Sequence, residues 1–352
     1  MMRSLLPLSG LGLCFAACMA PAVEPAQSEP YARDAIDAAN SAILQGDARR
    51  AIAVLSTAAP DGFRGPQRDQ RACMLGRLDR ARPPFLADGI DDPFVRNVLA
   101  AYQDYWWHAL ATPRQRAALD EQLLARLHNM MAQAGIAHDR SGDFDATETQ
   151  LTAALGERRY HAQMGRTPPL RELMLWRTQG TREFDVPLPE GEQRVKVELL
   201  DDFVALGWSA YGRCDHGSNG GWATAEKLFA IVPVYGDLEA EKFRVVFLGH
   251  EAQHFADQNR FPGLEPWELE YRAKLVELAQ ADAVSAKRLR GFITAQSDDP
   301  DSPHTYANKR VVEHLRAKLD AEPDQAPLAH LQATARELLL EDSARREGGA
   351  TH

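Results

Sequence analysis

Long apolar runs are missing from this sequence beyond its first 20 residues, so no later segment predicts a helix that spans a membrane. Runs of basic residues are missing as well, and no stripe combines basic with aromatic side chains. Because the net charge is also -10, we expect no nucleic acid partner. The remaining composition is that of a globular protein, since 45% of the residues are hydrophobic and can bury a full core.

Cysteine is also scarce, with four in 352 residues, and two of them, Cys14 and Cys18, lie in the N-terminal segment. This segment has Arg3, an apolar run from Leu5 to Ala20 and then a proline, an order typical of a secretory signal peptide. Residues 15–18, Phe-Ala-Ala-Cys, resemble a bacterial lipobox in which Phe replaces the usual Leu. We predict a signal peptide over residues 1–22 and export. The mature protein is then either a lipoprotein anchored to the membrane through Cys18, or free in the periplasm or secreted.

Apart from Cys18, the mature chain is expected to keep only Cys73 and Cys214. In an exported protein a disulfide is favoured over two free thiols, so we predict that Cys73 and Cys214 are joined. Neither residue has a second cysteine at C-x-x-C spacing, which makes a cysteine-bound metal the weaker alternative. The predicted bond ties the N-terminal half of the chain to the loop before the helix that carries residues 250–254.

Residues 250–254 read His-Glu-Ala-Gln-His, which is the pattern H-E-x-x-H. On a helix, His250 and His254 lie one turn apart on the same face and can offer two imidazole nitrogens to one metal ion. Glu251 lies beside them and can take a proton from a water molecule that the metal activates. The flanking residues favour a helix that begins with Asp237 as N-cap and ends before Pro262. The alternative is a chance match on a buried helix with two hydrogen-bonded histidines.

A catalytic zinc site needs a third protein ligand. At the spacing H-E-x-x-H-x-x-G-x-x-H the sequence has Arg260 instead of a third histidine. A helix opened by Pro266 supplies two carboxylates, Glu268 and Glu270. They are two residues apart and point to nearly opposite sides, so they cannot both face one metal. Periodicity does not decide between them, and either can belong to a solvated acidic face.

The H-E-x-x-H pattern followed by a helix-borne Glu-x-x-Ala resembles the gluzincin metallopeptidases, in which two histidines and a downstream glutamate bind zinc. The resemblance extends over residues 237–315, about a quarter of the chain. It implies a Zn²⁺ cofactor held by His250, His254 and Glu270, with Glu251 as general base. It also implies a peptide or protein substrate.

Residues 302–304 and 310–311 are similar to the Ser-x-His-Pro and Arg-Ile segments of the membrane-associated Ste24/HtpX-type peptidases. Two positions depart from those families, because Thr305 replaces the proline and Lys274 stands where an aspartate is usual. Peptide hydrolysis also needs a group that stabilises the oxyanion. The candidates for this group are His304, Tyr306 and Arg310, followed by His216 and Tyr271.

The spacing of apolar residues predicts an α+β fold. Residues 30–165 predict a helical N-terminal region, with one helix pair over 31–58 and a second pair that breaks at residues 112–113. Alternation on both sides of a turn at 189–191 predicts a β-hairpin. The strand predicted over 228–235, in which Pro233 suits a sheet edge, is by analogy with zincins the edge along which a peptide lies. A small antiparallel sheet is then expected to pack on zincin-like helices within residues 170–320, followed by a helix and polar tail over 324–352.

These patterns predict a zinc-dependent metallopeptidase that hydrolyses peptide bonds outside the cytoplasm. Glu251 is expected to assist the attack of zinc-activated water and to return the proton to the leaving amine. The alternative is a non-catalytic protein, either a zincin-like scaffold or an envelope lipoprotein that acts by binding another protein.

Overall fold

The computed structural model describes residues 28–81, 84–85, 89–139, 142–217, 220–224 and 226–349. These residues form helices and one five-stranded sheet, which confirms the predicted α+β class. The predicted signal peptide and Cys18 lie outside the described residues. Within the described ranges, no helix combines the length and the apolar character needed to cross a membrane.

Helices form the N-terminal part of the fold, and the helix pair over 31–58 and the break at residues 112–113 are both confirmed. Acidic caps help to start them; the carboxylate of Asp92, for example, accepts hydrogen bonds from two backbone N–H groups of the following turn. The elements are α1 (Pro30–Leu44), α2 (Ala48–Thr57), η1 (Pro60–Gly62), α3 (Gly65–Leu78), α4 (Pro93–Ala111), η2 (Pro113–Gln115), α5 (Arg116–Gln133) and α6 (Phe144–Glu157).

The sheet follows in the chain and has the spatial order β1-β2-β3-β5-β4. The strands are β1 (His161–Thr167), β2 (Leu170–Leu188), β3 (Gly191–Leu206), β4 (Gly221–Ala223) and β5 (Leu228–Ile231). The predicted hairpin is confirmed, with Leu188 opposite Gly191 at its turn. One strand pairing differs from the antiparallel sheet that was expected. β3 and β5 run parallel, because the chain crosses between them through α7 (Trp208–Gly212) and β4.

The predicted edge strand over 228–235 is wrong in two respects. The strand ends at Ile231, and Pro233 lies in the short helix α8 (Val232–Tyr235) instead of at a sheet edge. β5 is also paired on both sides, with β3 and β4, so that β4 occupies the edge position. Proline has no N–H for a strand ladder, and its fixed φ suits the first turn of a helix, which explains why the strand stops before it.

The C-terminal part is helical and contains the H-E-x-x-H residues. Its elements are α9 (Glu241–Phe243), the π-helical η3 (Arg244–Gly249), α10 (His250–Arg260), α11 (Pro266–Gln280), α12 (Ser285–Thr294), α13 (Pro303–Leu319), η4 (Pro323–Gln325) and α14 (Leu328–Gly349). Asp237 caps only a turn, in which its Oδ1 accepts a hydrogen bond from the backbone N–H of Glu239 at 2.9 Å. The helical segment therefore starts later than predicted, at Glu241. α14 continues to Gly349, so most of the predicted polar tail is helical.

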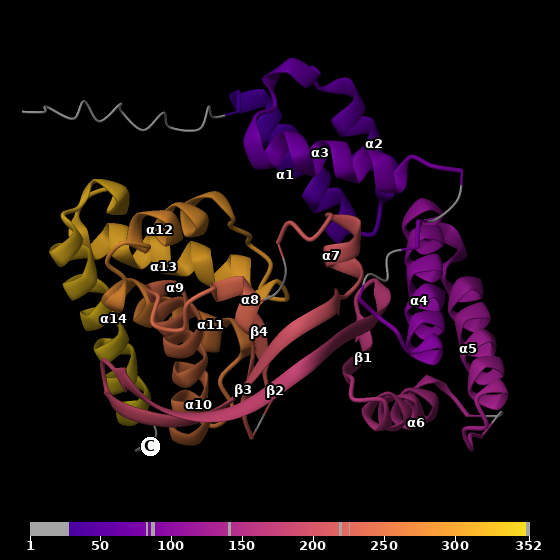
Figure 1. Ribbon diagram of the computed structural model, residues 1–352. Helices are drawn as coiled ribbons and strands as arrows, with labels where there is room; N and C mark the ends of the chain where they lie inside the picture. Colours follow the sequence, from indigo (N-terminus) through magenta and orange to yellow (C-terminus); the bar gives the residue numbers. More distant parts are fainter. Residues whose placement is uncertain are drawn as a thin grey trace, which may run out of the picture.

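Figure 1 shows the two helical groups at opposite ends of the long, curled β2–β3 hairpin. α4, α5 and α6 lie at the end that carries β1, and α10, α11 and α14 lie at the end that carries the hairpin turn. Leu170 and Leu173 of β2 belong to the core of the N-terminal helices, whereas Val186 packs on the helices that carry the motif. The hairpin therefore joins two cores, and the boundary predicted at residue 165 falls inside β1.

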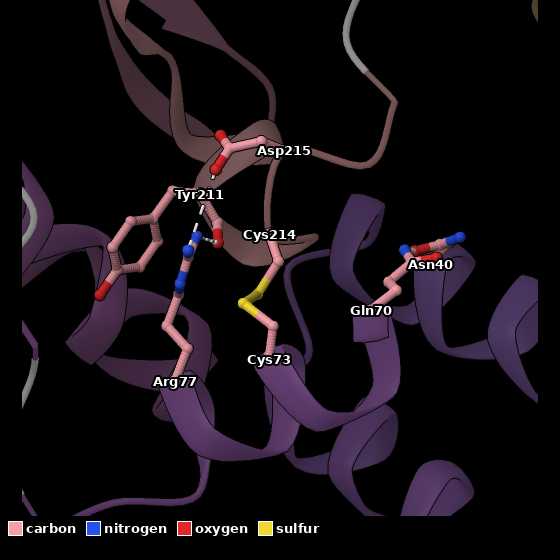
Figure 2. Close-up of a disulfide and its surroundings, with 7 residues drawn as sticks. All are labelled: Asn40, Gln70, Cys73, Arg77, Tyr211, Cys214 and Asp215. Carbon is pink, nitrogen blue, oxygen red and sulfur yellow. Dashed lines mark hydrogen bonds and ion pairs between the residues drawn. A yellow bond between two sulfur atoms is a disulfide. The ribbon is translucent and has the colours of Figure 1, made fainter. Parts of the chain in front are cut away.

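The predicted disulfide between Cys73 and Cys214 is confirmed, and it joins α3 to the loop after α7 (Figure 2). Beside it, the guanidinium of Arg77 donates to the backbone oxygen of Tyr211 at 2.6 Å and pairs with Asp215 at 3.8 Å. These bonds tie the N-terminal helices to the loop that leads into β4, the edge strand of the sheet.

Arg272 of α11 connects the elements around the motif, and its side chain is fully buried. The guanidinium pairs with Asp257 of α10 at 2.9 Å, with Asp342 of α14 at 2.8 Å and with Glu190 of the hairpin turn at 2.8 Å. A buried cation is tolerated only when carboxylates neutralise it, so these partners fix the position of α10 relative to α11 and the hairpin.

Candidate metal centre

His250 is the first residue of α10 and directly follows the π-helical segment η3. Short π-helical stretches often occur at functional sites in helices. Phe247 and Ala252, on either side of His250, pack in a core that includes the sheet. A Cβ at Gly249 would lie 3.2 Å from the side chain of Gln280 on α11. The absence of a side chain at Gly249 therefore allows α10 and α11 to approach closely at the candidate site.

His250, His254 and Glu270 meet between α10 and α11, and their ligand atoms all lie within 4.8 Å of one another. The two Nε2 atoms are 3.0 Å apart. Glu270 Oε2 lies 3.7 Å from His250 Nε2, and Oε1 lies 3.5 Å from His254 Nε2. Two ligands of a tetrahedral zinc ion, each at ~2.1 Å from it, are roughly 3.4 Å apart. The spacing and the donor types of this group therefore fit zinc.

The second ring nitrogen of His250 is held by Glu277, a fully buried residue two turns after Glu270 on α11. Nδ1 of His250 lies 2.7 Å from Glu277 Oε1, and Glu277 Oε2 accepts a hydrogen bond from Arg288. Burial lowers the pKa of His250, but the hydrogen bonds to Glu270 and Glu277 outweigh burial and raise the pKa to about 9. A carboxylate on Nδ1 fixes the ring and leaves Nε2 to face a metal.

His254 lacks such a partner. Its Nδ1 is buried and makes no hydrogen bond among the described residues. The two histidines therefore differ, because the orientation of His250 is fixed from outside the site while that of His254 depends on the group that its Nε2 faces.

Glu270 is held by two donors besides the histidines. Lys274 Nζ and His304 Nδ1 each lie 2.7 Å from its Oε2 atom. Burial raises the pKa of Glu270, but its hydrogen bonds with the histidines and the charge of Lys274 outweigh burial and hold the pKa well below its usual range. The carboxylate is therefore ionised, as ligation of a metal requires. Among the predicted oxyanion-stabilising residues, His304 is the one that touches this group.

Glu251, the predicted general base, is half-buried on α10. Burial, and after it the charge of Glu251, raise the pKa of Tyr235 well above its usual range. The hydroxyl of Tyr235 points to the backbone just before β4, since a Cβ at Gly220 would lie 2.2 Å from it. Tyr235 thus contacts the backbone next to the edge strand, and its hydroxyl is sensitive to the charge of Glu251. In the sequence Tyr235 ends an apolar run, and this position did not indicate a contact with the sheet edge.

Tyr306 and Arg310 make their contacts elsewhere on α13. The guanidinium of Arg310 donates to the Tyr306 hydroxyl at 2.6 Å and pairs with Glu313 at 3.0 Å. The ring of Tyr306 packs edge-on against Trp267. In the described part of the chain, no hydrogen bond or ion pair joins Tyr306 or Arg310 to the three candidate ligands.

The remaining candidates are also placed outside the group. The Tyr271 hydroxyl lies 2.8 Å from His314 Nδ1, and His216 lies in the loop after the disulfide. Glu268 caps the start of α11 and pairs with Arg346 at 3.0 Å. Of the two carboxylates that the sequence left open, Glu270 therefore faces the histidines and Glu268 does not.

Comparison with known proteins adds no relative. No family model, no curated protein and no solved structure matches the chain. The resemblance to gluzincins therefore depends on the H-E-x-x-H pattern and on the arrangement of the residues around it.

Proposed function

We propose that the protein is a zinc-dependent metallopeptidase that acts outside the cytoplasm. The observation that carries this proposal is the convergence of His250, His254 and Glu270 within 4.8 Å, with Glu251 beside them on the same helix. Two imidazoles and one carboxylate leave one position of a tetrahedral ion open, which is the arrangement of catalytic zinc sites. Structural zinc sites instead use four protein ligands.

Zinc would lower the pKa of water to about 7 and polarise the carbonyl group of a substrate. The chain itself holds and orients the ligands, since Glu277 fixes the ring of His250. Glu251 accepts the proton of the attacking water and delivers it to the leaving amine. His304 contacts the ligand group, and the Tyr235 hydroxyl is sensitive to the charge of Glu251, so these two residues are the candidates to donate a hydrogen bond to the oxyanion.

The sheet edge supports a peptide as the substrate class. β4 is the last strand in the sheet order and is paired with β5 on one side. An extended peptide can add to such an edge through backbone hydrogen bonds that do not depend on its sequence. Tyr235 contacts the backbone at Gly220, next to this edge, and the charge of Glu251 contributes to its raised pKa, so we propose that a peptide on β4 passes the general base.

The proposal is tested by measuring zinc content and peptide hydrolysis together. After incubation with zinc and dialysis, the mature protein should retain about one zinc per chain and cleave unfolded protein substrates. Glu251→Gln should keep the zinc and lose turnover, while His250→Ala should lose both. Zinc retention without turnover in the parent would favour the non-catalytic scaffold, and absence of zinc would remove the proposal.

A further inference from the structure

Lys274 is a buried cation inside the candidate metal centre. It follows Glu270 by one turn of α11, and only 4% of the residue is exposed. Its Nζ donates to Glu270 Oε2 at 2.7 Å and lies 5.5 Å from the centre of the Phe292 ring on α12. The ammonium group is therefore enclosed between a candidate zinc ligand and an aromatic ring, and it has little access to water.

The chain supplies one cation for each of the two buried carboxylates of this centre. Lys274 pairs with Glu270, and Arg288 pairs with Glu277. An unpaired buried carboxylate is strongly destabilising, and in many metal sites the metal itself removes that cost. Here the two carboxylates are neutralised by side chains, so the ligand group can stay assembled without a metal.

We propose that Lys274 is a resident counter-cation of Glu270 that weakens zinc binding and keeps the metal-free centre folded, so that zinc occupies the site exchangeably. This inference rests on the proposed function, since it assumes that Glu270 is a zinc ligand. Lys274 is a positioning residue, because it acts through Glu270 and is not itself placed to touch a substrate.

Two effects of Lys274 on zinc oppose each other. By holding Oε2, the ammonium fixes the carboxylate and directs Oε1 toward His254, which favours binding. An ammonium and a divalent ion bound to the same carboxylate also repel each other across a few ångströms of buried space, where Coulomb interactions are strong. The repulsion is the larger effect. When Lys274 is removed, Glu270 is still held by its contacts with His250, His254 and His304.

The sheet provides a control ion pair, in which 32% of the lysine side chain is exposed, against 5% for Lys274. Lys227 Nζ lies 2.7 Å from Glu198 Oε1, and it also lies over an aromatic ring, 5.3 Å from the centre of Phe229. Glu198 is buried like Glu270, with 5% and 8% of the residue exposed. The pair is therefore similar in chemistry, but it is on β3 and the β4–β5 connection instead of at the candidate ligands.

The test is the dissociation constant of Zn²⁺, measured by competition with a chromophoric chelator. Lys274→Met should bind zinc at least about tenfold more tightly than the parent. Lys274→Arg and Lys227→Met should stay within a few-fold of the parent. Without metal, Lys274→Met should unfold at a lower temperature than the parent, and zinc should raise its unfolding temperature by more. Lys274→Gln serves as a second variant if the methionine variant does not fold.

The failures of the two proposals are distinguishable. If Lys274→Met binds zinc as the parent does or more weakly, while His250→Ala abolishes binding, the role of Lys274 is overturned and the metal centre stands. If the parent and His250→Ala bind zinc equally, the metal centre is removed and the role of Lys274 with it.

Discussion

Nδ1 of His250 lies 2.7 Å from Oε1 of Glu277, a carboxylate that is completely buried beneath the candidate ligands. Glu277 comes from α11, 27 residues after His250, and Arg288 holds its other oxygen. The contact fixes which nitrogen of His250 faces the centre. It also links the two helices that carry the candidate ligands.

Glu277→Gln should weaken zinc binding by roughly 10–100-fold, because the neutral amide no longer supports the charge that develops on His250 when Nε2 binds a metal. The change keeps the size of the side chain, so folding should be largely retained. The measurement is chelator competition, with Glu313→Gln on α13, where 37% of the side chain is exposed, as control. Zinc affinity equal to that of the parent would show that the charge of Glu277 does not support metal binding by His250.

Glu270→Gln and Glu268→Gln distinguish the two carboxylates at the start of α11. Glu270 faces both histidines, whereas Glu268 accepts the backbone N–H of Glu265 and pairs with Arg346. We expect Glu270→Gln to weaken zinc binding by at least about tenfold, since it replaces an anionic ligand by a neutral one. Glu268→Gln should stay within a few-fold. Loss of zinc from Glu268→Gln alone would assign the third ligand to Glu268 instead.

The sequence contained the local features of this site but not all of its partners. Four-residue spacing on a helix places His250 and His254 together in any fold, so the pair was predictable. The contact between Lys274 and Glu270 is also local. However, a Glu and a Lys four residues apart on a helix usually form a solvated pair on its surface. Only the packing of α12 against α11, which buries Lys274 under Phe292, makes it part of the centre.

The sheet edge was mispredicted for a physical reason. β4 contains only three residues, of which one is glycine. Such a segment is too short to show the alternation of apolar and polar residues that predicts a strand. The apolar run that starts at Leu228 is a clearer strand signal, but it is buried because β3 and β4 pair with it on both sides. The sequence pattern shows that a segment is apolar enough to form a strand. It does not show which strands lie beside it, because the order of strands in a sheet depends on pairing between distant segments.

Reduction of the Cys73–Cys214 disulfide should lower the free energy of unfolding by roughly 3–5 kcal/mol, since the bond closes a loop of 141 residues. The check is chemical denaturation of the parent and of the double variant Cys73→Ser/Cys214→Ser. Zinc binding should be unchanged, because the disulfide joins α3 to the loop before β4 and does not hold α10 or α11. Two free thiols in the denatured, unreduced protein would contradict both the pairing and the proposed export.

Glu172 should make stability depend on pH. Its Oε1 accepts backbone hydrogen bonds from Trp208 at 3.0 Å and Leu173 at 3.1 Å, but burial outweighs them and raises the pKa from 4.5 to about 7. Between about pH 4.5 and pH 7 the folded chain therefore holds a proton that the unfolded chain has lost, and the free energy of unfolding falls as pH rises through this window. This pKa shift corresponds to about 3 kcal/mol in the free energy of unfolding. The contribution is present at low pH and is lost as the pH rises through about 7.

Glu172→Gln removes this titration while its amide oxygen can still accept the two backbone hydrogen bonds. Urea denaturation at pH 5 and pH 8 is the measurement. At pH 8 the variant should be more stable than the parent by roughly 1–3 kcal/mol, and at pH 5 the difference should be much smaller. Glu157→Gln on the exposed end of α6, where 79% of the side chain is exposed, should leave the pH dependence unchanged. A variant that is less stable than the parent at pH 8 would show that the charged carboxylate stabilises the fold, which is the opposite of the effect expected from its burial.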